Sequence, residues 1–213
     1  MSFPITNSLD DSRPFGHAVI IPHAQRVAIT GGIACGKSVF ARFLSDLGCE
    51  VIDADDVVHR LEAPGGCAVP LISKAFGPAV IGADGGVDRG ALGRLVFAET
   101  RERERLNALV HPLVRAELDA WFQRRGGGAA RFAVIPLLFE VGWRDAWDMI
   151  VCVACRAEEQ ARRLRGRGLT DEESARRLRA QWPVAEKARL ADRVIWNDGS
   201  LEMLRREAER LVR

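Results

Sequence analysis

A phosphate-binding motif, GGIACGKS at residues 31–38, constrains the fold more than any other feature of this sequence. It fits the pattern G-x-x-x-x-G-K-[ST] without a gap. In such a loop, glycines let the backbone curl until successive N–H groups point at phosphate oxygens, and the following helix adds the positive end of its dipole. The motif therefore needs a strand before it and a helix after it. The apolar run at residues 27–29 and the amphipathic segment at residues 37–47 meet both needs.

The last residues of the motif carry the expected chemistry. Lys37 can reach the β and γ phosphates of ATP, and the Ser38 hydroxyl can ligate Mg²⁺. A chance match in a glycine-rich turn is the alternative, and the flanking strand and helix disfavour it. We predict ATP with Mg²⁺ as the cofactor, and the predicted nucleotide-binding residues are Gly32, Ile33, Ala34, Cys35, Gly36, Lys37, Ser38 and Val39.

Short β-rich runs alternate with helical segments along the rest of the chain. The predicted strands lie at residues 27–30, 50–53, 132–135, 149–153 and 193–196. Several of these runs are apolar on both faces, which is typical of a parallel sheet covered by helices. We predict an α/β fold of the P-loop kinase type, in which helices flank a five-stranded parallel sheet.

Helical spacing also predicts individual helices. One is expected at residues 37–47 and another at residues 112–122. Thr170 and Glu173 have the spacing of a capping box, so a helix should start there and end near Gln181. The residues expected on the buried side of a C-terminal helix are Leu201, Leu204, Ala208 and Leu211.

The same segments suggest how the chain is organised. Residues 1–25 show no sustained periodicity and are predicted to be a loosely ordered N-terminal extension. Residues 26–213 are predicted to form one domain. Within it, the stretch from about 56 to 125 is too long for a simple crossover, so we assign it to an inserted helical subdomain that binds the acceptor. The glycines at residues 126–128 are expected to form the loop that ends it.

Charge and hydropathy exclude several classes of protein. The formal net charge of +2 is the difference between 31 basic and 29 acidic residues, so no global field indicates a nucleic-acid or membrane partner. No apolar run is long enough to span a membrane, and the first residues lack the pattern of a secretory signal. We therefore expect a cytoplasmic protein with a small-molecule substrate. The sequence carries no signal for its oligomeric state.

The five cysteines are scattered along the chain and fit a reducing compartment better than a disulfide framework. Cys152 and Cys155 have C-x-x-C spacing, which can indicate redox chemistry or half a zinc site. No second pair completes a metal site, and both residues follow an apolar run. A buried strand with small residues is therefore the favoured interpretation.

A phosphate loop alone does not separate a kinase from a GTPase or a motor ATPase. The sequence has no N-K-x-D motif for reading guanine, and the predicted strand at residues 132–135 runs into Pro136 rather than the acidic residue of a motor ATPase. A small-molecule kinase is therefore favoured.

An acidic run gives the second expected site. Asp53, Asp55 and Asp56 come at the end of the second predicted strand, where ligands bind in open α/β sheets. Phosphoryl transfer to a hydroxyl needs a carboxylate near the attacking oxygen. Capping of the next helix by Asp55 or Asp56 is the alternative.

With these segments in place, the sequence resembles the dephospho-CoA kinases from about residue 27 to the C-terminus. The residues that carry the resemblance are Thr30-Gly-Gly-Ile, Gly36-Lys-Ser, Asp53-Ala-Asp55, His59, Pro64-Gly65, Asp88-Arg89, Leu92, Phe97, His111-Pro112, Pro136-Leu-Leu-Phe-Glu140, Gln160, Arg163, Arg167, Gln181, Ala191-Asp192 and Asn197. The resemblance implies transfer of the γ-phosphate of ATP to the ribose 3′-hydroxyl of dephospho-CoA, the last step of coenzyme A synthesis.

The resemblance also implies roles for individual residues. Asp55 would be the general base, and Asp53 would support the metal and acceptor site. Arg163 and Arg167 would lie in a lid at about residues 156–182 and, with Lys37, act on the transferring phosphoryl group. Arg89, Leu137 and Glu140 would contact the acceptor, and Asn197 would lie beside the adenine.

The residues themselves support part of this picture. Arg162, Arg163, Arg165 and Arg167 form a cluster free of acids, and guanidinium groups suit bidentate phosphate contacts. A solvated helix face or a nucleic-acid patch is the alternative, although no interleaved aromatics accompany the cluster. Two other functions stay open: a kinase for a different small alcohol, and a nucleotide-binding module that acts on a partner protein.

Two residues depart from the family's usual loop. Ala34 and Cys35 stand in the middle, and the curl is expected to survive if Ala34 lies at negative φ. A thiol beside helix-terminal N–H groups should have a lowered pKa, so one hypothesis is that oxidation of Cys35 blocks ATP binding. The alternative is that cysteine simply replaces another small residue.

Overall fold

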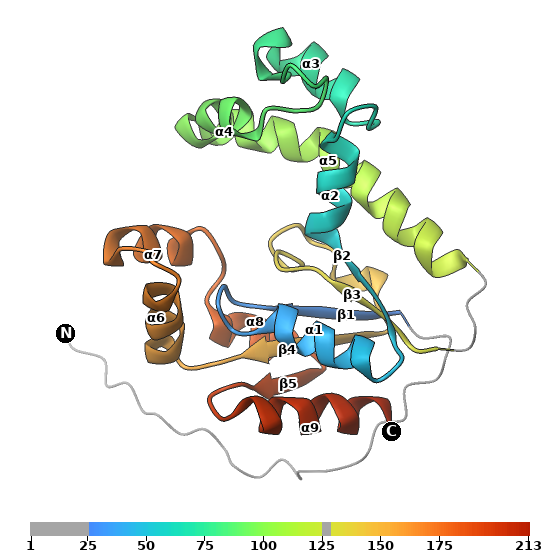
Figure 1. Ribbon diagram of the computed structural model, residues 1–213, viewed down its shortest axis with the longest axis vertical. Helices are drawn as coiled ribbons and strands as arrows, with labels where there is room; N and C mark the ends of the chain where they lie inside the picture. The colour runs from blue at the N-terminus through green and yellow to red at the C-terminus, as the bar shows by residue number, and fades with distance from the viewer. Residues whose placement is uncertain (1–25, 125–128) are drawn as a thin grey trace, which may run out of the picture.

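A parallel sheet flanked by helices forms the centre of the computed structural model, which describes residues 26–124 and 129–213 (Figure 1). The predicted N-terminal extension and the glycine loop at residues 126–128 lie outside the described residues. The strands are β1 (Val27–Gly31), β2 (Glu50–Asp53), β3 (Arg131–Val134), β4 (Met149–Ala154) and β5 (Arg193–Trp196). Their order in the described sheet is β2-β3-β1-β4-β5, and every pair is parallel. The predicted fold class is confirmed.

Side chains alternate across the sheet and divide the core into two layers. Val27 and Ile29 face a layer that α1 (Lys37–Asp46) and α9 (Leu201–Val212) complete, with Phe40 and Leu204 fully or almost fully buried in it. Ala28 faces the opposite layer, which is covered by α2 (Ala54–Glu62), α5 (Thr100–Gln123) and α8 (Val184–Leu190). This double cover explains why the strand sequences are apolar on both faces.

A group of helices projects from one edge of the sheet. In Figure 1, α2 and α5 rise from that edge and carry α3 (Val69–Phe76), a short 3-10 turn η1 (Pro78–Val80) and α4 (Arg89–Ala98). Asp53 caps the first turn of α2 and Asp88 caps that of α4, each through a carboxylate that accepts backbone N–H bonds. None of the described helices has an apolar stretch long enough to cross a membrane.

Another pair of helices, α6 (Ala157–Gly166) and α7 (Asp171–Arg179), follows the carboxyl end of β4 and stands apart from this group in Figure 1. The capping box predicted at the start of α7 is confirmed, because the Thr170 hydroxyl accepts from the Glu173 N–H and the Glu173 carboxylate accepts from the Thr170 N–H. A 3-10 turn η2 (Arg144–Ala146) completes the elements.

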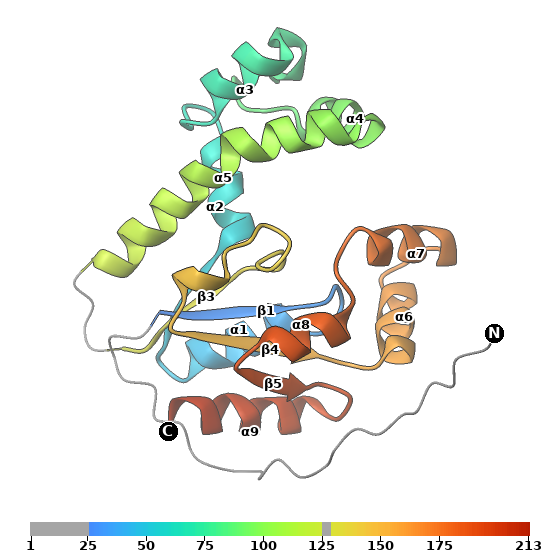
Figure 2. The same ribbon diagram turned by 180° about the vertical axis from the view of Figure 1, so that it is seen from behind.

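Two details of the predicted helices are wrong. The helix expected to start at Pro112 begins at Thr100, and the proline lies inside it. Figure 2 shows α5 bending part-way along its length, as expected where a proline removes one backbone hydrogen bond. Leu201, expected on the buried side of the C-terminal helix, is 63% exposed because it occupies the outer side of the first turn.

The contrast between Leu201 and Leu204 gives a stability test within one helix. Replacing Leu204, which is 2% exposed, with alanine should lower the free energy of unfolding by about 2–5 kcal/mol, because it leaves a cavity between α9 and the sheet. Leu201→Ala should change it by less than about 0.5 kcal/mol. Urea unfolding followed by circular dichroism measures both, and equal effects would contradict the assignment.

Candidate active site

Loops at the carboxyl ends of the strands gather at one edge of the sheet. Because the strands are parallel, these ends lie side by side, and open α/β sheets bind ligands there. The phosphate loop follows β1, Asp53 ends β2, Pro136 follows β3, Cys155 follows β4 and Asn197 follows β5. The fold therefore brings most of the predicted site residues to one place.

The phosphate loop passes through positive φ at two glycines and one alanine. The φ angles are 142° at Gly31, 60° at Ala34 and 100° at Gly36. A Cβ at Gly31 would lie 2.0 Å from the carbonyl oxygen of Val153, so glycine is needed there for space as well. The condition of negative φ at Ala34 is not met, and the loop is curled with this residue at positive φ. This conformation costs an L-residue about 1–2 kcal/mol, so other contacts must hold the loop in shape.

Those contacts come from α6 and from the end of β5. The Nη1 group of Arg163 donates to the carbonyl of Ala34 at 3.2 Å, and its Nη2 group donates to the carbonyl of Asn197 at 2.7 Å. The buried Asn197 side chain donates in turn to the carbonyl of Cys35 at 2.8 Å. Arg163 and Asn197, from two distant segments, therefore form one network with Ala34 and Cys35 that fixes the middle of the loop.

Lys37 and Ser38 begin α1 directly after the curl. The Lys37 ammonium donates to the carbonyls of Gly31 and Gly32 at 3.0 and 2.8 Å, which uses two of its three N–H groups. Burial lowers the pKa of Lys37, and the negative charges of Cys35 and Asp55 oppose that change. The Ser38 side chain is exposed at the end of the loop.

The acidic run occupies the start of α2. One carboxylate oxygen of Asp53 accepts from the N–H of Asp55 at 2.9 Å, so the capping residue is Asp53 rather than Asp55 or Asp56. Burial raises the pKa of the Asp53 carboxyl against this hydrogen bond, and the two neighbouring carboxylates add to the increase. Asp55, in the first turn, is left to face the adjoining cavity.

That cavity has a volume of about 220 Å³ and lies between α2, α5 and the segment after β3. Most of its wall is apolar, and its lining residues are Ala54, Asp55, Val58, Glu62, Leu106, Asn107, Val110, His111, Val114, Ile135, Pro136, Leu137, Val141 and Trp143. His111 packs edge-on against Trp143, and burial lowers the pKa of its imidazole. Leu137, predicted to contact the acceptor, lies in this wall.

Comparison with known proteins agrees with this geometry. The family model for dephospho-CoA kinase matches residues 25–203. The chain belongs to the dephospho-CoA kinase family. A dephospho-CoA kinase of Symbiobacterium thermophilum is 46% identical over 188 residues, which cover 86% of this chain and 78% of that protein.

Solved structures show the same relationship. The crystal structure of TT1252 from Thermus thermophilus matches with a TM-score of 0.77 and 38% identity, covering 88% of this chain and 96% of that one. A dephospho-CoA kinase from Campylobacter jejuni matches with a TM-score of 0.68 and 27% identity, covering 88% and 94% of the two chains. The fold is thus shared with a solved dephospho-CoA kinase.

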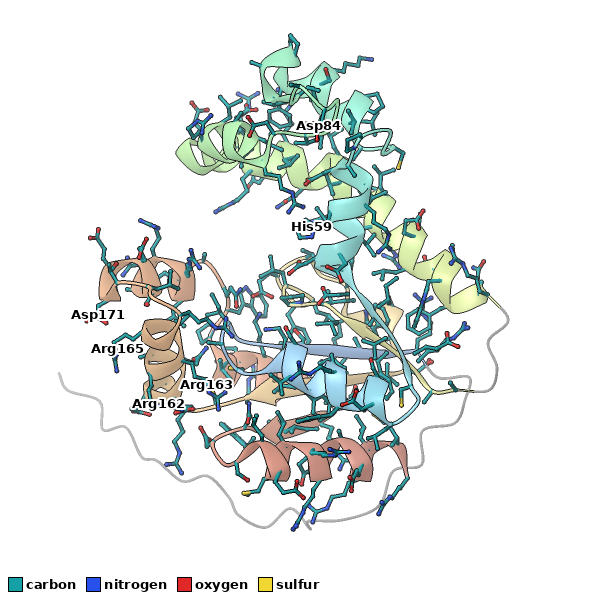
Figure 3. All side chains as sticks on the ribbon, viewed as in Figure 1. His59, Asp84, Arg162, Arg163, Arg165 and Asp171 are labelled. Atoms are coloured by element: carbon teal, nitrogen blue, oxygen red, sulfur yellow. The ribbon has the colours of Figure 1, made fainter. Side chains whose placement is uncertain are left out.

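In this member of the dephospho-CoA kinase family, the four arginines of the cluster point in different directions. Arg163 points from α6 toward the sheet, whereas Arg165 lies on the outer side beside Asp171, at 3.5 Å (Figure 3). Arg162 pairs with Glu159. Arg167 is exposed, and within residues 26–124 and 129–213 it forms no ion pair closer than 4.0 Å.

The predicted acceptor residues Arg89 and Glu140 occupy different positions. The Arg89 guanidinium donates to the buried carboxylate of Glu62 at 2.8 Å, and Glu62 lines the cavity. Glu140 is not among the lining residues of the cavity, and its Oε1 atom accepts from the ammonium of Lys187 at 2.6 Å and from the N–H of Trp182 at 2.9 Å. Glu140 therefore organises the segment after β3.

Lys187 was not singled out by the sequence. Its side chain is fully buried, and its ammonium also donates to the carbonyl of Pro136 at 2.7 Å. The hydroxyl of Thr30 contacts the same carbonyl at 3.3 Å. A lysine in an amphipathic helix gives no sign of burial in the sequence, because its partners come from another part of the chain.

Two glutamines form the other contact that the sequence did not assign. The side chain of Gln160 donates to the carbonyl of Ile33 at 2.8 Å, and the Oε1 atom of Gln181 accepts from the N–H of Ile33 at 3.0 Å. The backbone carbonyl and the backbone N–H of Ile33 are therefore both held by the segment that contains α6 and α7. Gln160 and Gln181 carry part of the family resemblance, and that was the available signal.

Removing the Gln160 side chain should weaken nucleotide use selectively. Gln160→Ala leaves a carbonyl of the phosphate loop without its partner, at a cost of about 1–3 kcal/mol. We expect the KM for ATP to rise about tenfold while the KM for the acceptor changes little. Steady-state kinetics with each substrate varied in turn measures both.

The matched control is Gln123→Ala, at the exposed end of α5, which should leave both KM values unchanged. Equal increases in the two KM values for Gln160→Ala would indicate general destabilisation and would contradict this role.

Proposed function

We propose that this protein transfers the γ-phosphoryl group of ATP to the ribose 3′-hydroxyl of dephospho-CoA and so forms coenzyme A. The observation that carries the proposal is the position of Asp55. Its carboxylate lines an apolar cavity and also acts electrostatically on Lys37 of the phosphate loop. One carboxylate is thus shared by a phosphate-binding loop and a cavity suited to an organic acceptor. Membership of the dephospho-CoA kinase family supports the same reaction.

In this mechanism, Asp55 accepts the proton of the attacking hydroxyl as the phosphoryl group arrives. The N–H groups of the phosphate loop and the start of α1 hold the β and γ phosphates, and Lys37 balances the charge that develops between them. Transfer of this kind depends on positioning and charge more than on covalent help from the protein. His111 and His59 are therefore expected to be structural.

The donor set fits Mg²⁺. The Ser38 hydroxyl at the end of the phosphate loop and the Asp53 carboxylate at the end of β2 would supply oxygen ligands, and Mg²⁺ typically takes one or two carboxylates together with waters and substrate phosphates. Bound Mg²⁺ would neutralise charge on the phosphates. Asp53 would hold this site, and its hydrogen bond from the Asp55 N–H keeps both carboxylates in a fixed relation.

The two predicted lid arginines, Arg163 and Arg167, would have different roles. Arg163 has Glu159, Ala34 and Asn197 as partners, so its contribution is to hold the phosphate loop and the end of β5 together. Arg167 is exposed at the end of α6, which leaves it able to turn toward the transferring phosphoryl group. Closure of α6 and α7 over bound ATP would bring it there.

The cavity beside Asp55 suits one part of dephospho-CoA. Its apolar wall can take an uncharged portion of the acceptor, while Arg89, paired with Glu62 at the cavity, supplies a positive charge for the diphosphate group. The helices α3 and α4 lie farther out along the same side (Figure 1) and would extend the acceptor surface.

A panel of acceptors tests the reaction. ADP formation should be rapid with dephospho-CoA and absent with nucleosides and gluconate, and mass spectrometry with tandem fragmentation should place the new phosphate on the 3′ position. Turnover with a nucleoside or gluconate in place of dephospho-CoA would identify a different small-alcohol kinase. Absence of turnover with every acceptor would point to a nucleotide-binding module.

Substitution of Asp55 tests its role as the base, and substitution of the neighbouring Asp56 provides the comparison. Asp55→Asn should lower kcat by about 10²–10⁴-fold with little change in the KM for ATP, because the amide cannot accept the hydroxyl proton. Asp56→Asn is the matched control. The Asp56 side chain is 71% exposed, and its one ion pair within the described residues is with His59, at 3.9 Å. The kcat of Asp56→Asn should therefore match that of the wild-type protein. An undiminished kcat in Asp55→Asn would show that the base is another group.

A further inference from the structure

Two cysteines that are 120 positions apart meet beneath the phosphate loop. The thiol of Cys155, at the end of β4, donates to the sulfur of Cys35 at 3.4 Å. Both are almost completely buried, at 0% exposure for Cys35 and 3% for Cys155. The C-x-x-C spacing in the sequence therefore points to the wrong partner, because Cys152 is buried within β4 and Cys155 faces the loop instead.

A cavity gives small molecules a route to this pair. It has a volume of about 1020 Å³, and Cys155, Gly32, Gln160 and Trp182 are among the residues that line it. The sulfur of Cys35 lies directly behind Gly32, because a Cβ on that glycine would come within 3.1 Å of it. Both sulfurs are thus next to the cavity wall, although little of their surface is exposed.

The two thiols differ in acidity in a way that suits oxidation. The hydrogen bond from Cys155 lowers the pKa of Cys35 to about 7 against the opposing effect of burial, and the charge of Lys37 contributes. The same hydrogen bond, together with burial, raises the pKa of Cys155. Cys35 is therefore the more acidic thiol of the pair and the one that more readily forms a nucleophilic thiolate.

We propose that Cys35 and Cys155 are a modification site, at which hydrogen peroxide forms a reversible disulfide that weakens ATP binding. The Cys35 thiolate attacks one peroxide oxygen, the O–O bond breaks, and hydroxide leaves to be protonated to water. The resulting sulfenic acid is attacked by the sulfur of Cys155, the S–O bond breaks, and the departing hydroxide takes the thiol proton as a second water. Two electrons pass from the two sulfurs to the peroxide.

The bond must distort the loop because the sulfurs have to move closer. A disulfide has an S–S length of about 2.05 Å, well below the present 3.4 Å. Cys35 lies between Ala34, already at positive φ, and Gly36, and its carbonyl is held by Asn197. We expect closure of the gap between the sulfurs to pull on the Cys35 backbone and so to shift the neighbouring N–H groups that would face the phosphates.

Peptide mapping of the whole protein tests the site without any variant. The reduced protein is exposed to hydrogen peroxide, quenched with catalase, denatured in N-ethylmaleimide and digested without reductant. We expect a peptide pair joined through Cys35 and Cys155, which dithiothreitol separates. Finding both residues alkylated, under conditions that oxidise the exposed Cys67, would overturn the proposal.

Two variants sharpen the assignment. Cys155→Ser should abolish the cross-linked peptide, whereas Cys67→Ser, in the exposed turn before α3, should form it in wild-type yield. A cross-link of Cys35 to any other cysteine in the wild-type protein would overturn the pairing, and this result does not depend on how either variant folds.

Calorimetric titration with ATP and Mg²⁺ tests the consequence and needs no acceptor, so it does not depend on the proposed reaction. The oxidised protein should bind ATP at least about tenfold more weakly than the reduced protein, and dithiothreitol should restore the affinity. By linkage, saturating ATP should slow formation of the cross-link. Equal affinities of the two forms would overturn the proposal.

Discussion

The phosphate loop depends on support from outside its own sequence. Ala34 adopts a left-handed conformation that costs about 1–2 kcal/mol, and hydrogen bonds from Arg163 and Asn197 hold it there. Because these two residues come from α6 and from the end of β5, the loop has its shape only when both elements are in place. Nucleotide binding is therefore coupled to the packing of the C-terminal half of the chain.

The acceptor side is joined to the same framework by a buried lysine. Lys187 holds Glu140 and the carbonyl of Pro136, and Thr30 at the end of β1 contacts that carbonyl as well. Loss of one partner of such a buried pair costs about 3–5 kcal/mol, since the other charge stays buried without compensation. The wall of the cavity proposed for the acceptor and the strand that leads into the phosphate loop are thus fixed by one group of interactions.

Much of the fold could be predicted because the pattern of apolar residues within each short segment indicates its secondary structure. The strands of a doubly covered parallel sheet are apolar throughout, and the observed strands lie within one residue of the predicted ones. The start of α5 was missed because proline normally opens a helix, whereas here apolar residues such as Leu106 and Val114 on both sides of Pro112 pack against one core. Leu201 was misplaced because periodicity does not show where a helix meets its neighbours.

The sequence by itself determined the local features of the candidate site: a phosphate loop with Lys37 and Ser38, and an acidic run with Asp53 and Asp55 at a strand end. Each of these features consists of residues only a few positions apart, so it can be recognised directly in the sequence. Only the tertiary structure decided which residues support them. Gln160 reaches Ile33, Lys187 reaches Glu140, and Cys155 reaches Cys35, because parallel strands bring the ends of distant segments to one edge of the sheet.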